Sequence, residues 1–103
     1  MKASTDQTSI SKEEVANLIK QNPFQVKLID VRTREEYLEK HIDGAIHVPL
    51  DTLTNTGNIF DLNDHLITAC GKGGGRSIQG AENLRAIGYK NVYWLEGGTF
   101  GWF

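Results

Sequence analysis

The sequence predicts an α/β domain in which parallel strands alternate with helices. Short apolar segments rich in branched residues, typical of strands buried on both faces, alternate with segments of helical periodicity. Capping boxes, glycines and prolines separate these segments. Strands that alternate with helices imply right-handed crossovers, which place helices on both faces of the sheet. The 103 residues suffice for one hydrophobic core and show no repeat or linker.

The chain begins with a polar segment, 1–9, which we expect to be a short lead-in to a domain spanning 10–103. A brief edge strand is expected at 8–10. Ser11 and Glu14 then have the spacing of a capping box, which predicts the start of a helix. This helix is expected to run to about Gln21, because Val15, Leu18 and Ile19 make an apolar i, i+3, i+4 stripe.

The middle of the chain contains the segment with the strongest strand pattern. Residues 26–31 (VKLIDV) are almost continuously apolar, which suits a central strand of a parallel sheet. Thr33 and Glu36 form a second capping box, which predicts a short helix to about residue 40. A short strand is expected at 45–48, where a proline stops it. Residues 51–64 are polar with turn signals, and we interpret them as a loop with one helical turn.

The last third of the chain repeats the alternation of strands and helices. A strand is expected at 66–69, with Cys70 at its carboxyl end, and a last strand at 91–95. A helix is expected over 76–87, with Gly88 just past its end. Its predicted buried face consists of Ile78, Ala81, Leu84 and Ile87.

The loop between the third strand and its helix has the features of an anion-binding site. Four glycines lie within 70–75, so the backbone can turn its N–H groups inward just before a helix N-terminus. Lys72 and Arg76 add positive charge, and the loop contains no acid. These surroundings favour the thiolate of Cys70, which predicts a nucleophile or a carrier of anionic sulfur. The predicted binding residues around it are Gly71, Lys72, Gly73, Gly74, Gly75, Arg76 and Ser77.

Two other interpretations of this loop are less favoured. A lone cysteine is often a small buried core residue, but the cationic glycine loop argues against that interpretation here. A nucleotide-binding loop needs Gly-Lys followed directly by Ser or Thr. Here Lys72 precedes three glycines, so nucleotide binding is not expected.

Composition excludes several classes of function. Eleven basic and thirteen acidic residues give a net charge of −2, which argues against nucleic-acid and anionic-membrane surfaces. The single cysteine cannot form an intrachain disulfide, and no signal-peptide core is present, so we expect a cytoplasmic protein. No metal is expected either, because His41, His47 and His65 lack the spacing of a ligand set and fit structural roles.

Four stretches together resemble the single-domain rhodanese family: LIDVRTREEYLEKHIDGAIHVPL, LITACGKGGGRS, AENLRAIGY and NVYWLEGG. The resemblance runs from about Ile10 to Gly98. It implies a rhodanese-like fold with a five-stranded parallel sheet in the order 1-5-4-2-3. It also implies that Cys70 accepts sulfane sulfur as a persulfide. Asp30 and Arg32 match the family's Asp-x-Arg, which implies that they support the active-site region.

One departure from the family pattern leaves a rival interpretation open. Sulfurtransferases of this kind commonly have Cys-x4-Arg, whereas Cys70 and Arg76 have the spacing Cys-x5-Arg. The wider loop is similar to that of rhodanese-fold phosphatases and arsenate reductases, where an arginine can hold two oxygens of an oxyanion. Against this rival, Ala69 stands where such phosphatases have histidine, and no general acid lies in the loop, although Glu96 could approach it. We therefore expect phosphate to bind weakly without being turned over.

The predicted function is that of a sulfurtransferase that passes sulfur from a donor such as thiosulfate to cyanide or a thiol. An acceptor protein is a further candidate partner, and no cofactor is required. A sulfur carrier or interaction module with low turnover is the non-enzymatic alternative.

We interpret the aromatic residues near the C-terminus as core or lid packing: Trp94, Phe100, Trp102 and Phe103. The family usually has a helix after the final glycine pair, and its near absence here would leave apolar surface for a partner. The predicted oligomeric state is a monomer or weak dimer.

Overall fold

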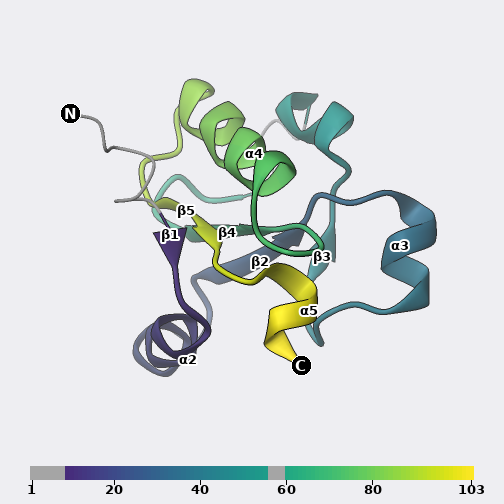
Figure 1. The fold of residues 1–103 in the computed structure, drawn as a ribbon. Helices are drawn as coiled ribbons and strands as arrows, with labels where there is room; N and C mark the ends of the chain where they lie inside the picture. Colours follow the sequence, from purple (N-terminus) through teal and green to yellow (C-terminus); the bar gives the residue numbers. More distant parts are fainter. Residues whose placement is uncertain (1–8, 56–59) are drawn as a thin grey trace.

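The computed structural model describes residues 9–55 and 60–103, which form one parallel sheet flanked by helices (Figure 1). The strands are β1 (Ser9–Ile10), β2 (Val26–Asp30), β3 (Ile46–His47), β4 (His65–Ala69) and β5 (Val92–Leu95). They lie in the order β1-β5-β4-β2-β3, and every pair is parallel. The predicted α/β fold and sheet order are therefore confirmed. The predicted start of the edge strand at Thr8 lies outside the described residues.

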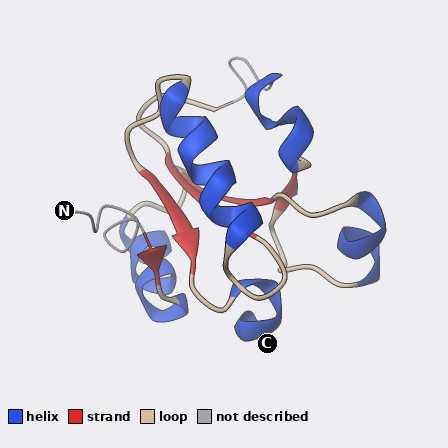
Figure 2. Ribbon diagram, turned by 45° about the horizontal axis from the view of Figure 1, so that its top comes forward, coloured by secondary structure: helices blue, strands red, loops and turns tan. Residues whose placement is uncertain are grey.

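Helices cover both faces of the sheet. They are α2 (Lys12–Gln21), α3 (Arg34–Glu39), the 3-10 helix η1 (Leu50–Asn55), α4 (Gly75–Ala86) and α5 (Gly98–Trp102). Figures 1 and 2 show α4 and η1 on one face, with α2 and α5 on the other. A hydrophobic cluster lies on each face, one beneath α4 and one beneath α2. In the described part of the chain, no helix is long and apolar enough to cross a membrane.

Both predicted capping boxes are present. The Glu14 amide donates to Ser11 Oγ at 3.1 Å, and the Ser11 amide donates to Glu14 Oε1 at 2.9 Å. At α3 the Thr33 amide donates to Glu36 Oε1 at 3.1 Å, and the Glu36 amide donates to Thr33 Oγ1 at 3.3 Å. These local bonds satisfy amides that have no partner within the helix, so short sequence signals suffice to place the helix starts.

The almost continuous apolar pattern of β2 reflects its central position. Ile29 belongs to the cluster beneath α4, whereas Leu28 belongs to the cluster on the opposite face. The strand is paired on one side with β4, where Asp30 lies opposite Ala69, and on the other side with β3. The end of β2 therefore lies directly beside the end of β4, where Cys70 follows.

Two features differ from the predicted elements. The segment 51–64, predicted as loop with one turn, begins inside the six-residue η1, which forms because Leu53 is fully buried beneath α4. Residues 56–59 of that segment lie outside the described residues. The close approach is possible because residue 80 is glycine: a Cβ there would lie only 3.3 Å from Leu53. The predicted buried face of α4 is wrong at Ile87, which is 40% exposed, and Ile78 is only partly buried. The helix ends at Ala86, and Gly88 at φ +118° then turns the chain away.

The expected near absence of a C-terminal helix is also corrected. The five residues of α5 form a short helix directly after Gly97, which has φ +78°. Trp102 of this helix packs against the cluster beneath α2. The helix forms because the chain must turn back across the ends of β4 and β5, where its first amides find carbonyl partners in the Cys70 loop.

Candidate active site

Cys70 lies at the carboxyl edge of the parallel sheet, where ligands bind in open α/β folds. It follows β4, a strand in the middle of the sheet, and the residue is only 5% exposed. A hollow of about 530 Å³ opens beside it. The hollow is lined by the loop from Cys70 to Arg76, by Glu36 of α3 and by Phe100 of α5. The structure thus brings the predicted thiol loop together with residues from two other elements.

Ser77 is the immediate polar neighbour of the thiol. Its hydroxyl oxygen lies 3.4 Å from Cys70 Sγ, accepts a bond from the Gly74 amide at 3.2 Å and donates to the Gly74 carbonyl at 3.0 Å. Burial alone would raise the pKa of the Cys70 thiol. The hydrogen bond with the Ser77 hydroxyl, together with bonds from the amides of Ser77, Gly74 and Gly73, outweighs burial, so the pKa is lowered. This environment favours the nucleophilic thiolate form of the cysteine.

Replacing Ser77 with alanine is expected to raise the pKa of Cys70, because the hydrogen bond between the hydroxyl and the sulfur is lost while burial remains. The pH midpoint of alkylation by iodoacetamide should move upward, and the rate below that midpoint should fall. Ser11→Ala removes a hydroxyl of similar bonding role at α2 and is the control. An unchanged midpoint in Ser77→Ala would mean that the backbone amides alone set the ionisation of the thiol.

The loop is held in place by α5. The Thr99 amide donates to the Cys70 carbonyl at 2.8 Å, and the Phe100 amide donates to the Gly71 carbonyl at 3.0 Å. Gly98 lies so close to the loop that a Cβ there would be 2.6 Å from both the Cys70 carbonyl oxygen and the Gly73 nitrogen. The glycine pair after β5 therefore helps to shape the candidate site, a role that no short sequence pattern indicates.

Asp30 and Arg32 form a buried ion pair beneath the site. Arg32 Nη2 lies 2.8 Å from Asp30 Oδ2, its Nε donates to Asp30 Oδ1 at 3.0 Å, and each side chain is 1% exposed. The Arg32 amide also donates to Asp30 Oδ1 at 3.0 Å. Arg32 Nη2 further donates to the Lys40 carbonyl at 2.6 Å, so the pair joins the end of β2 to the end of α3. These partners hold the Nε and Nη2 groups of the arginine in place.

Arg76 is not an unpaired cation beside the thiol. Its guanidinium binds the Glu36 carboxylate through two bonds, Nη1 to Oε1 at 2.7 Å and Nη2 to Oε2 at 3.1 Å. From the sequence alone, Glu36 is expected only to cap α3, because its capping-box position accounts for an acid there. The two partners lie 40 positions apart in the sequence, so no local signal indicated the pair. Lys72, in contrast, is exposed in the loop and has no acidic partner among the described residues.

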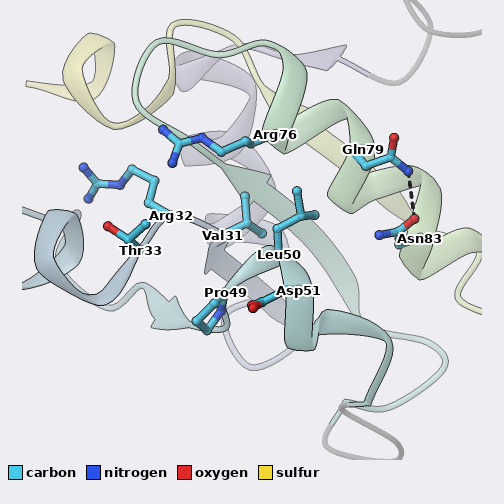
Figure 3. Close-up of a pocket in the computed structure, with 9 residues that line it drawn as sticks. All are labelled: Val31, Arg32, Thr33, Pro49, Leu50, Asp51, Arg76, Gln79 and Asn83. Carbon is cyan, nitrogen blue, oxygen red and sulfur yellow. Dashed lines mark hydrogen bonds between the residues drawn. The ribbon is translucent and has the colours of Figure 1, made fainter.

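A second hollow lies on the other side of Arg76. This groove has a volume of about 600 Å³ and lies between α4, η1 and the segment that follows β2 (Figure 3). Val31, Pro49 and Leu50 supply apolar surface, while Gln79 and Asn83 present a hydrogen-bonded amide pair from α4. Arg76 is the residue that lines both hollows.

The histidines near β3 have structural contacts. His41 and His47 both stack on Tyr37, with ring centroids 3.9 and 4.7 Å away. The ring nitrogens lie 2.8 Å from the carbonyl oxygens of Tyr37 and Arg32, respectively. Their positions are accounted for by packing around α3.

The fold and the site together define a class of small parallel α/β domains that carry a cysteine in a glycine-rich loop at the carboxyl edge of the sheet. The chain belongs to the rhodanese-like domain family, whose model matches residues 11–103. It is 35% identical over 96 residues to thiosulfate sulfurtransferase GlpE of Tolumonas auensis, covering 92% of this chain and 87% of that protein.

Two further similarities differ in extent. The solved structure of the human single-domain sulfurtransferase TSTD1 is 26% identical, with a TM-score of 0.80, and the match covers 92% of this chain and 94% of that one. The putative sulfur carrier protein YrkF of Bacillus subtilis is 32% identical over 77 residues. That match covers 75% of this chain but only 41% of YrkF, so the chain spans less than half of that relative.

Proposed function

We propose that this protein is a sulfurtransferase in which Cys70 carries sulfane sulfur as a persulfide. The observation that carries the proposal is the Cys70 thiol, which lies against the Ser77 hydroxyl in a loop whose hydrogen bonds favour the thiolate. Its similarity to a thiosulfate sulfurtransferase supports the same reaction class.

The reaction consists of two thiol–sulfane exchanges. The Cys70 thiolate attacks the outer sulfur of a donor such as thiosulfate, a new S–S bond forms, and the donor's S–S bond breaks. Sulfite leaves with the electron pair. A nucleophilic acceptor, cyanide or a thiol, then attacks the outer persulfide sulfur and takes it, which returns the Cys70 thiolate.

The neighbouring residues have separate roles in this proposal. Loop amides and Ser77 stabilise the anionic sulfur, and Lys72 attracts an anionic donor. Asp30 and Arg32 support the end of β2 beside the site. The acceptor is a small thiol or, as the similarity to a putative sulfur carrier suggests, a protein thiol. The proposed setting is the cytoplasm, where an unpaired cysteine stays reduced.

Intact-mass analysis tests the proposal directly. The fully reduced protein, incubated with thiosulfate, is expected to gain one sulfur atom, and subsequent cyanide should remove it. Cys70→Ser should gain none, because the chain contains no other cysteine. An unchanged mass with thiosulfate and with other sulfane donors would refute sulfur transfer. Fast loading followed by slow discharge to every small acceptor would instead favour the carrier alternative.

Replacing Lys72 with alanine is expected to slow loading from thiosulfate by about two- to fivefold, the effect of an exposed charge worth up to about 1 kcal/mol. Loading from a neutral organic trisulfide should change less, because the lysine acts on the donor's charge. Lys90→Ala is the control, since that exposed lysine precedes β5 and so lies near the amino-terminal ends of the strands, whereas Cys70 follows the carboxyl end of β4. Equal losses with both donors would show that Lys72 acts through the shape of the loop.

A further inference from the structure

The two bonds between Arg76 and Glu36 occupy the part of the arginine that an oxyanion would use. A guanidinium binds a carboxylate or a phosphate through the same parallel pair of N–H groups. Here both terminal nitrogens are engaged, at 2.7 Å and 3.1 Å, by the two carboxylate oxygens of Glu36. A tetrahedral anion in the loop that binds through this terminal pair must displace Glu36 from Arg76.

Glu36 is itself held in position by the start of α3. Its Oε1 accepts bonds from the Thr33 amide at 3.1 Å and from the Thr33 hydroxyl at 3.0 Å. The bond with Arg76, followed by the bonds with Thr33, lowers the pKa of Glu36 to about 2. The carboxylate is thus charged and correctly oriented before any ligand arrives.

Arg76 remains within reach of the thiol loop. Its side chain lines the hollow that contains Cys70, and a Cβ on Gly71 would lie 4.0 Å from Arg76 Nη2. Figure 3 shows the side chain extending from the start of α4 toward Arg32 and Thr33, the side on which α3 begins. The arginine is near enough to serve the loop, but its hydrogen bonds are directed to Glu36.

We propose that Glu36 is a specificity-determining positioning residue that withholds Arg76 from tetrahedral oxyanions. The loop has the seven-membered spacing suited to phosphate or arsenate, yet Glu36 leaves it with backbone amides and the single charge of Lys72. The amides and Lys72 suffice to bind sulfane donors, but they bind phosphate or arsenate poorly. Only the choice of sulfur transfer as the favoured reaction rests on the proposed function.

The test uses inorganic phosphate as the probe and the alkylation rate of Cys70 by neutral iodoacetamide as the readout. Phosphate in the loop slows alkylation, and each variant is compared with its own rate without phosphate. In Glu36→Gln the concentration giving half-maximal protection is expected to fall at least about tenfold relative to wild type, equivalent to about 1.4 kcal/mol. Glutamine also serves at this position of a capping box, so α3 keeps its N-terminal bond.

Two control variants separate this role from a structural one. Glu14→Gln makes the same change in the capping box of α2 and should leave phosphate protection at the wild-type level. Glu36→Gln combined with Arg76→Gln should lose the gained affinity, because the released arginine is then absent. Equal protection in wild type and Glu36→Gln, or a gain that survives in the double variant, would overturn the proposal. Thiosulfate loading of the wild-type protein, measured separately, reports on the proposed function and not on Glu36.

Discussion

Asp30→Ala is expected to lower the free energy of unfolding by about 3–5 kcal/mol, the usual cost of removing one partner from a buried ion pair. Arg32 would keep its charge in a site where its side chain is 1% exposed. Its amide, Nε and Nη2 would no longer have the Asp30 carboxylate as a hydrogen-bond acceptor. Domains of this size are stable by only about 5–15 kcal/mol, so the expected decrease is a large fraction of the total free energy of unfolding. Urea denaturation of both proteins measures it.

Glu35→Ala provides the comparison for this prediction. Glu35 is an exposed acid of α3, and its removal should change the free energy of unfolding by no more than about 0.5 kcal/mol. A similarly small change in Asp30→Ala would show that solvent or another group compensates Arg32. We also expect slower sulfur loading in Asp30→Ala, since Asp30 pairs in register with Ala69, the residue before Cys70.

Gly98→Ala is expected to displace the thiol loop. The new Cβ would lie 2.6 Å from the Cys70 carbonyl oxygen, 2.6 Å from the Gly73 nitrogen and 2.7 Å from the Gly71 carbonyl oxygen. All three are backbone atoms, so the loop or α5 must move. Since misplacement by about 1 Å can cost about 100-fold in rate, we expect sulfur loading to fall by about that factor. Single-turnover loading from thiosulfate measures the effect.

Gly44→Ala is a matched control for backbone strain. Gly44 has φ +85°, compared with +60° at Gly98, but a Cβ at Gly44 would meet no atom within 4 Å. This variant should lose only about 1–2 kcal/mol of stability, which is the cost of the left-handed conformation for alanine. It should load sulfur at the normal rate. Comparable loading in the two alanine variants would mean that the contact between Gly98 and the loop does not position the thiol.

Much of the fold could be predicted because its signals are local. The capping boxes at Ser11 and Thr33 each involve residues three positions apart, and the apolar run of β2 marks a strand buried on both faces. The parallel order of the sheet followed from the family resemblance and is confirmed by the pairing of the strands. The glycine loop after β4 likewise indicated a thiol site, because loop residues adjacent in sequence stay adjacent in space.

Other features of the site depend on contacts that no short pattern encodes. The burial of Leu53 against Gly80 and the docking of α5 on the Cys70 loop join segments that are far apart in the sequence. The sequence predicted neither contact, since each depends on how crossovers stack elements on the sheet. The exposed position of Ile87 has the same origin, because the turn at Gly88 follows from the packing of α4 and not from helical periodicity.

The sequence by itself determined the α/β class, the helix starts and the chemistry of a cysteine surrounded by glycines and cations. The tertiary structure decided which of those cations, among the described residues, faces the site without an acidic partner. Lys72 and Arg76 look alike as loop cations, yet only the fold places Glu36 of α3 within 2.7 Å of Arg76. The reason is physical: the identity of a charged side chain is local, but its partner is set by which chain segments packing brings together, and a bidentate partner directs the hydrogen bonds of an arginine.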